Sequence, residues 1–148
     1  MPTVEKIART DAGLASELRL SVMRLRRRLA SERHPDNELS IAHMGVLGCL
    51  YRTDGLTIGE LAAAERVQPP SMTRTVNGLE ERGYVTRRPH ESDGRLVVVE
   101  LSDKGRTIVL ADRRRRDEWL ARRLRDLTPD ERAVLRRAAP ILERLANA

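Results

Sequence analysis

The 148-residue sequence is poor in aromatic side chains, with one tryptophan, two tyrosines and no phenylalanine. Surfaces that bind single-stranded nucleic acid by base stacking need aromatic faces, so this composition argues against an RRM or an OB fold. Lysine is scarce as well, because Lys6 and Lys104 are the only two lysines among 28 basic residues. Arginine makes forked contacts to phosphate and guanine that lysine cannot make, although a codon bias towards arginine produces the same composition.

Residues that bind metals or act as nucleophiles are also few. Cys49 is the single cysteine, so no internal disulfide can form, and the three histidines lie far apart in the sequence. The sequence contains no His-Glu-x-x-His, Cys-x-x-Cys or Gly-x-Ser-x-Gly motif and no glycine-rich phosphate loop. We therefore expect no enzymatic activity, no cofactor and no metal site, and we interpret Cys49 as a small core residue.

Long apolar runs are absent too. No stretch approaches the roughly 18 apolar residues that a membrane span requires. The first residues, Met1–Lys6, contain no apolar segment of the kind found in secretory signals. A lone cysteine suits a reducing compartment. We expect a cytoplasmic protein that does not associate with membranes, and the 40% hydrophobic content is sufficient for a folded core.

Apolar spacing and capping residues predict three helices in the first part of the chain. The first, over 12–34, has apolar residues at spacings of four and three, which form one helical face, and Pro35 ends it. Ser40 is placed to cap the second helix. The run Thr57–Glu60 is a capping box, because the threonine and glutamate side chains each satisfy a backbone amide at a helix start. It predicts a third helix over 58–65, whose inward residues, together with one just beyond its end, are Ile58, Leu61, Ala62 and Val67.

A fourth helix and a hairpin follow. Pro69 and Pro70 suit a helix start, where a missing amide costs nothing, and this helix is expected to run to about Arg82. The period then changes from helix to strand, with strands predicted over Val85–Arg88 and Leu96–Leu101. The inward face of the fourth helix is formed by Met72, Val76 and Leu79.

The last third of the sequence predicts two more helices. Ser102 can cap a helix of about 25 residues. The run Thr128–Glu131 is a second capping box with proline at the first helical position, and it begins the final helix. Pro140 lies inside that helix and is expected to kink it or weaken one turn.

Three short helices followed by a β-hairpin is the order of a winged helix-turn-helix. We therefore predict a mainly α fold with a small β-wing, combined with a helical dimerisation region. The expected divisions are an N-terminal dimerisation helix over 1–36, a winged helix-turn-helix module over 37–101 and C-terminal dimerisation helices over 102–148. Because the terminal helices carry more apolar surface than the small module can cover, we expect a homodimer.

The fourth helix is the predicted recognition helix for the DNA major groove. Its outward side chains have the right chemistry, because amides can pair with adenine, arginine can fork onto guanine, and hydroxyls can bind phosphate or a base edge. The alternative is that some of these residues are only solvated or cap the helix. The expected DNA-binding residues are Gln68, Pro69, Pro70, Ser71, Thr73, Arg74 and Asn77.

The hairpin is predicted to supply a second DNA contact. An arginine at its tip is attracted by the negative potential of a narrow minor groove. DNA would repel Asp93, so we expect this carboxylate to brace the turn and aim Arg95. The wing residues expected at DNA are Arg87, Arg88, His90 and Arg95.

Several runs together resemble the MarR family of transcriptional regulators. The wing run Asp93–Gly105 has Asp-x-Arg, an apolar strand and then Leu-Ser-x-x-Gly, as that family has. Upstream, Leu56–Ala62, Met72–Val76 and Leu79–Val85 are similar to its helix-turn-helix in order and spacing. The resemblance implies a homodimeric regulator, usually a repressor, that binds double-stranded DNA at a near-palindromic site and is often released by a small molecule. It places Arg74 in the major groove and Arg95 at the wing, and it leaves the effector site unassigned.

Net charge does not by itself support this interpretation. The formal charge is +6, but the predicted DNA module, residues 56–101, carries six basic and seven acidic side chains. The excess lies in residues 102–148, which carry 13 basic and eight acidic ones. The rival hypothesis is a helical protein–protein interaction module that binds no specific DNA, and the two differ in the role they give Arg74 and Arg95.

Overall fold

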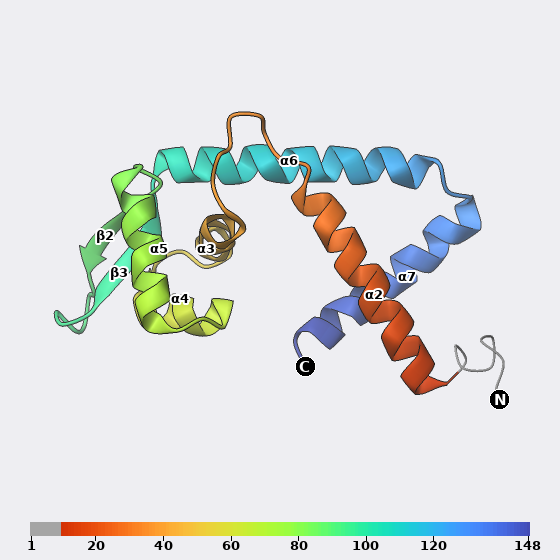
Figure 1. Ribbon diagram of the computed structural model, residues 1–148, viewed down its shortest axis with the longest axis horizontal. Coiled ribbons are helices and arrows are strands. Elements are labelled where there is room, and N and C mark those ends of the chain that lie inside the picture. Colours follow the sequence, from red (N-terminus) through yellow and green to blue (C-terminus); the bar gives the residue numbers. More distant parts are fainter. Residues whose placement is uncertain (1–9) are drawn as a thin grey trace. The chain divides into compact units, whose positions relative to one another are not determined.

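The computed structural model describes residues 10–148, which divide into two compact units (Figure 1). We call Arg33–Arg114 the winged unit. The terminal unit comprises Met1–Glu32 and Arg115–Ala148, of which residues 1–9 lie outside the described part. The long helix α6, Asp103–Arg125, contributes residues to both units.

The winged unit combines three short helices with a three-stranded antiparallel sheet. The strand order is β1-β3-β2, with Leu56 opposite Val99 and Val85 opposite Leu101. The short strand β1 was not predicted, because two residues are too few to show an alternating pattern. The elements are α3 (Ile41–Arg52), β1 (Leu56–Thr57), α4 (Ile58–Glu65), α5 (Pro69–Glu81), β2 (Val85–Pro89) and β3 (Val97–Leu101).

Local capping explains where these helices begin. The Ser40 hydroxyl accepts a hydrogen bond from the His43 amide, and Ser102 does the same for the Gly105 amide. Thr57 and Glu60 form the predicted capping box at the start of α4. The predicted helix starts at these three positions are therefore confirmed, and so is the inward face of α5, whose Met72, Val76 and Leu79 are buried.

One predicted core residue is wrong. Val67 is 44% exposed. Helix α4 ends at Glu65, and Arg66 takes a left-handed backbone conformation with a φ of 54°. The chain therefore turns before Val67, which falls between the two helices instead of continuing the buried face of α4. The core of the unit is formed by Leu39, Val46, Leu47, Cys49, Leu50, Leu61, Ala62, Met72, Val76, Leu79, Val85, Val99 and Val109.

The terminal unit contains α2 (Asp11–Ala30) and α7 (Pro129–Ala146) in addition to the second half of α6. Helix α2 ends four residues before the predicted position, and at its end the Ser31 hydroxyl donates to the Arg28 carbonyl. Helix α7 begins with the predicted Thr128 capping box and continues across Pro140. In residues 10–148 no helix has the length and apolarity that crossing a membrane demands.

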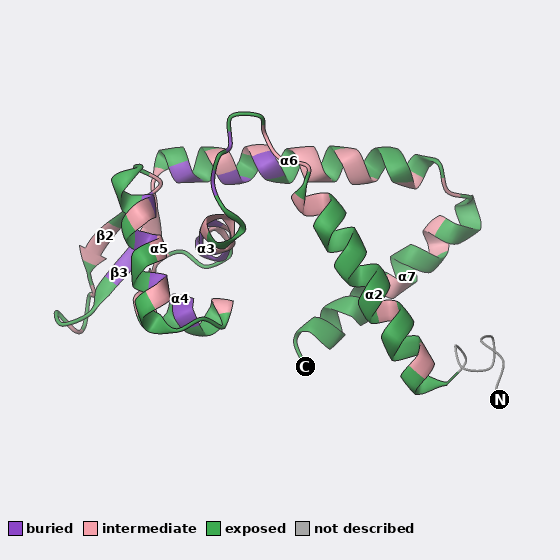
Figure 2. Cartoon of the chain, in the orientation of Figure 1, coloured by how far each residue is buried: buried purple, intermediate pink, exposed green. Residues whose placement is uncertain are grey.

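No residue of the terminal unit is buried within the described ranges 10–32 and 115–148 (Figure 2). Large apolar side chains on both α2 and α7 face solvent instead. A helix with an apolar face stabilises a fold only when that face is covered. The exposed residues are Leu14, Leu20, Val22, Met23, Leu25, Val134, Leu135, Ile141, Leu142 and Leu145.

Candidate nucleic-acid interface

Helix α5 turns a continuous polar face to solvent, opposite its buried apolar face. Of the seven residues predicted for this surface, only Ser71 is partly buried, and the others are exposed. The exposed ones are Gln68, Pro69, Pro70, Thr73, Arg74 and Asn77.

The start of α5 offers side chains rather than backbone amides to a ligand. Pro69 and Pro70 carry no amide hydrogen, and the amides of Ser71 and Met72 both donate to the Gln68 carbonyl. Gln68 stands at the N-cap but makes no side-chain capping hydrogen bond. Amide capture of phosphate, which many helix starts allow, is therefore not available here.

Two hydroxyls and one arginine, those of Ser71, Thr73 and Arg74, lie in the first turns of α5. The Thr73 hydroxyl donates to the Pro69 carbonyl at 3.0 Å, which leaves its oxygen as an acceptor. The guanidinium of Arg74 is exposed, and its Nη2 lies 3.5 Å from the Ser71 hydroxyl oxygen. Arg74 is thus the cation that the outward face of α5 presents.

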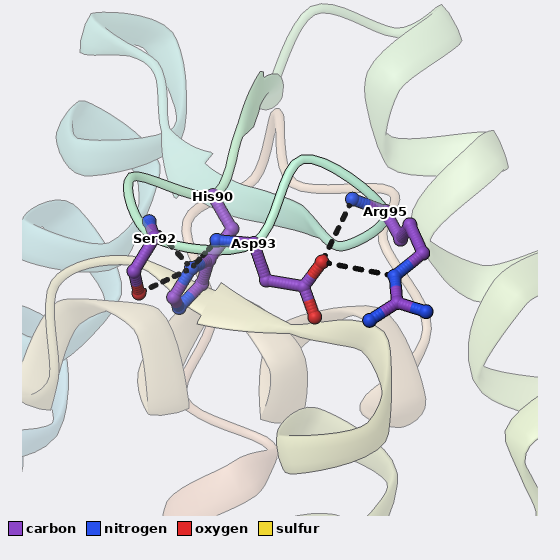
Figure 3. Close-up of polar contacts among 4 residues, drawn as sticks. All are labelled: His90, Ser92, Asp93 and Arg95. Atoms are coloured by element: carbon purple, nitrogen blue, oxygen red, sulfur yellow. Dashed lines mark hydrogen bonds and ion pairs between the residues drawn. The ribbon is translucent and has the colours of Figure 1, made fainter.

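The wing tip is held by two side chains that bond to the turn backbone (Figure 3). Asp93 Oδ1 accepts from the backbone amide of Arg95 at 3.1 Å and lies 3.3 Å from its Nε. His90 Nδ1 accepts from the amides of Ser92 and Asp93, both at 3.2 Å. A nitrogen that accepts carries no proton, so the neutral His90 ring has its proton on Nε2. The Arg95 side chain itself is 92% exposed.

The two arginines of β2 point to opposite faces of the sheet. Arg87 lies on the same face as buried Val85 and reaches α5, where it donates to Asn77 Oδ1 and pairs with Glu80 at 3.2 Å. Arg88 faces the other way and donates to Glu100 at 2.5 Å, which raises the pKa of the guanidinium. Both are partly buried.

These pairings alter the charge that the surface presents. Glu80 and Glu100 pair with Arg87 and Arg88, which are partly buried, whereas Arg74 and Arg95 are exposed, Arg95 with Asp93 beside it. The two glutamates were not predicted as partners. The alternation of side chains along a strand could have predicted that Arg87 points towards α5, because it places Arg87 on the same face as Val85, which packs inward.

A buried polar cluster ahead of α3 was also missed. Asp112 of α6 is fully buried and accepts from the His34 backbone amide at 3.0 Å and from Asn37 Nδ2 at 2.5 Å. Asn37 in turn accepts from the Leu39 amide. The cluster ties the loop before α3 to α6 within the winged unit. More than 70 residues separate its two sides, so no local pattern indicates it.

The fold and this surface together define a winged helix-turn-helix protein, in which α4 and α5 form the helix-turn-helix and β2 and β3 the wing. A sequence profile of the MarR family matches residues 39–97. An HTH-type transcriptional regulator of Mycobacterium tuberculosis is 46% identical over 138 residues, which cover 93% of this chain and 96% of the relative. The chain therefore belongs to the MarR family of DNA-binding transcriptional regulators, and it is not an enzyme.

Solved structures agree with this assignment. A MarR family protein from Bacillus stearothermophilus superimposes with a TM-score of 0.81 at 25% identity, covering 95% of this chain and 97% of that one. FabT of Streptococcus pneumoniae, solved in complex with DNA, shares the fold with a TM-score of 0.73 at 22% identity and covers 93% and 98% of the two chains.

Proposed function

We propose that this protein is a homodimeric repressor that binds a near-palindromic site in double-stranded DNA. The observation that carries the proposal is the pairing of an exposed polar face on α5, centred on Arg74, with an exposed Arg95 on a braced wing tip. A helix of this kind fits the major groove, and the wing contacts the neighbouring backbone or minor groove. FabT, which has the same fold, is solved with DNA, and this supports the assignment.

The homodimer follows from the terminal unit. None of its described residues, 10–32 and 115–148, is fully buried, and ten large apolar side chains of α2 and α7 are exposed to solvent. A second copy offers the same apolar faces and covers them by two-fold symmetry. A two-fold dimer places two α5 helices about 34–36 Å apart, one DNA turn, and this spacing requires a near-palindromic site.

The repressor activity and its release by a small-molecule effector rest on membership of the family. We place the protein in the cytoplasm, where its DNA target lies. Within the described residues 10–148, no group of three or more His, Cys, Asp or Glu side chains is suitable for holding a metal ion. A transcription assay with purified protein and the selected duplex upstream of a promoter decides between repression and activation.

DNA binding is tested by selecting duplexes from a randomised pool and measuring affinity for the selected and for random sequences. Arg74→Ala should weaken binding to the selected duplex by about 10- to 100-fold, the value of one arginine contact to a guanine. Arg114→Ala, which removes the same charge from an exposed position on α6, should change affinity little. Wild-type protein that binds selected and random duplexes equally would overturn the proposal and favour a protein–protein interaction module.

A further inference from the structure

The contact between the wing strand β2 and helix α5 fixes one side chain of the DNA-binding surface. Arg87 donates to the side-chain oxygen of Asn77, and its Nε lies 3.2 Å from Glu80 Oε2. Asn77 and Glu80 are three residues apart on α5, so both lie on the side of the helix that faces β2. The Nε atom of Arg87 is buried without a hydrogen-bond partner, so Glu80 holds it by charge, and the side chain as a whole is 28% exposed.

The chemistry of the contact determines which way the Asn77 amide faces. An asparagine amide has an oxygen acceptor at one end and an amino donor at the other. A guanidinium contains donors only, so the end that faces Arg87 is the oxygen. Asn77 is exposed, and its Nδ2 amino group is the end that remains for a base edge. Asparagine recognises adenine by accepting from its 6-amino group and donating to N7 at the same time. The Oδ1 atom has two lone pairs, and Arg87 uses one of them, so the contact fixes the orientation of the amide and leaves the Nδ2 donor with one acceptor site beside it.

We propose that Arg87 is a positioning residue for base recognition rather than a phosphate contact. It holds the Asn77 carbonyl and so directs the Nδ2 donor of Asn77 towards base acceptors in the major groove, such as purine N7. Glu80 keeps the guanidinium in place through the ion pair. This inference rests on the proposed DNA-binding function and specifies which chemical groups of the base pair the protein recognises.

The first test uses wild-type protein and modified DNA, so it does not depend on the folding of a variant. The base pair recognised by Asn77 is located as the position where Asn77→Ala loses its preference among the four base pairs. Replacing the purine there with its 7-deaza analogue, which lacks the N7 acceptor, should weaken binding by about 10-fold or more. An unchanged affinity for the 7-deaza duplex overturns the inference, as does an Asn77→Ala variant with unaltered preferences.

The second test separates positioning from phosphate contact by salt dependence. Arg87→Met should lose the preference at the Asn77 position and keep the slope of log affinity against log salt, and Arg87→Lys should retain much of the preference. The double variant with Asn77→Ala should discriminate no worse than Asn77→Ala alone. The matched control is Arg114→Met at an exposed position on α6, which should leave the preference at the Asn77 position intact.

Two results would overturn the inference that Arg87 positions Asn77. If Arg87→Met lowers the salt slope by about one per protomer and weakens all sequences equally, Arg87 contacts phosphate and the inference is wrong. That result leaves the proposed function standing. If wild-type protein shows no preference for any duplex, the proposed function and this inference fall together.

Discussion

At the scale of single residues, Cys49 illustrates how burial decides the chemistry of a side chain. Cys49 is a residue of α3 that is only 7% exposed, and burial raises the pKa of its thiol. The thiolate is the reactive form, so a raised pKa and low exposure both slow oxidation. We expect the native thiol to react with a disulfide reagent at least about 10-fold more slowly than in urea. DNA binding should be unaffected by peroxide, and rapid native labelling would contradict this.

His43 makes the free energy of unfolding depend on pH. Burial and, to a lesser extent, the nearby Arg82 guanidinium lower the pKa of His43 below its ordinary 6.5. In the unfolded chain the ring binds a proton near pH 6.5, while in the folded chain it does so only at lower pH. The unfolded state therefore binds more protons in this window, and the free energy of unfolding falls as pH drops through it.

The measurement is urea denaturation at pH 7.5 and at pH 5, at one protein concentration. His43→Gln should lose less stability than wild type over this interval, because glutamine does not titrate. An NMR titration of the His43 ring provides the direct check, and a midpoint at or above 6.5 would show that the prediction is wrong.

At the scale of elements, Gly105 lets α6 begin directly against the wing. A Cβ at this position would lie 2.1 Å from the Tyr84 carbonyl oxygen, so any side chain forces the backbone apart. Gly105→Ala should lower the free energy of unfolding by about 3 kcal/mol or more. The matched control is Gly48→Ala in the middle of α3, where a Cβ meets only Arg52 Nη1 at 3.6 Å. That change should raise stability by about 0.5–1 kcal/mol, and thermal or urea unfolding measures both.

At the scale of the whole molecule, the proposed homodimer predicts that stability and DNA binding both depend on covering the terminal helices. Leu135 and Leu142 lie seven residues apart on α7, so they share one face, and both are exposed in the single chain. Leu135→Glu with Leu142→Glu places two carboxylates on this face. We expect this double variant to sediment as a monomer where the wild type sediments as a dimer. We also expect it to bind a duplex that contains both half-sites more weakly than the wild type does.

Ile41→Glu provides the control for that experiment. Ile41 is 73% exposed at the start of α3, outside the terminal unit. Replacing this apolar side chain with a carboxylate should therefore leave the dimer intact. A double variant that sediments as wild type does would exclude this face of α7 from the dimer interface. A wild-type monomer at micromolar concentration would overturn the homodimer itself.

Sequence information was sufficient for helix starts and for the buried face of a helix, although the end of α2 and the turn at Arg66 were not predicted. The helix starts at Ser40, Thr57, Ser102 and Thr128 were predictable because a cap and the amide it satisfies lie within three residues of each other. The inward face of α5 was predictable because the helical period determines which residues share a face. The family resemblance follows from the same local runs of residues.

Tertiary structure decided the features in which distant segments meet. The partners of Arg87 and Arg88, the short strand β1 and the buried Asp112 depend on which face of a strand or helix packs against another element. The scarcity of aromatic and lysine side chains leaves arginine as the main candidate for contacts to DNA. The sequence could not show which arginines are exposed. Packing decided this, because Arg87 and Arg88 are partly buried against glutamates of neighbouring elements, whereas Arg74 and Arg95 are exposed, even though Asp93 pairs with Arg95.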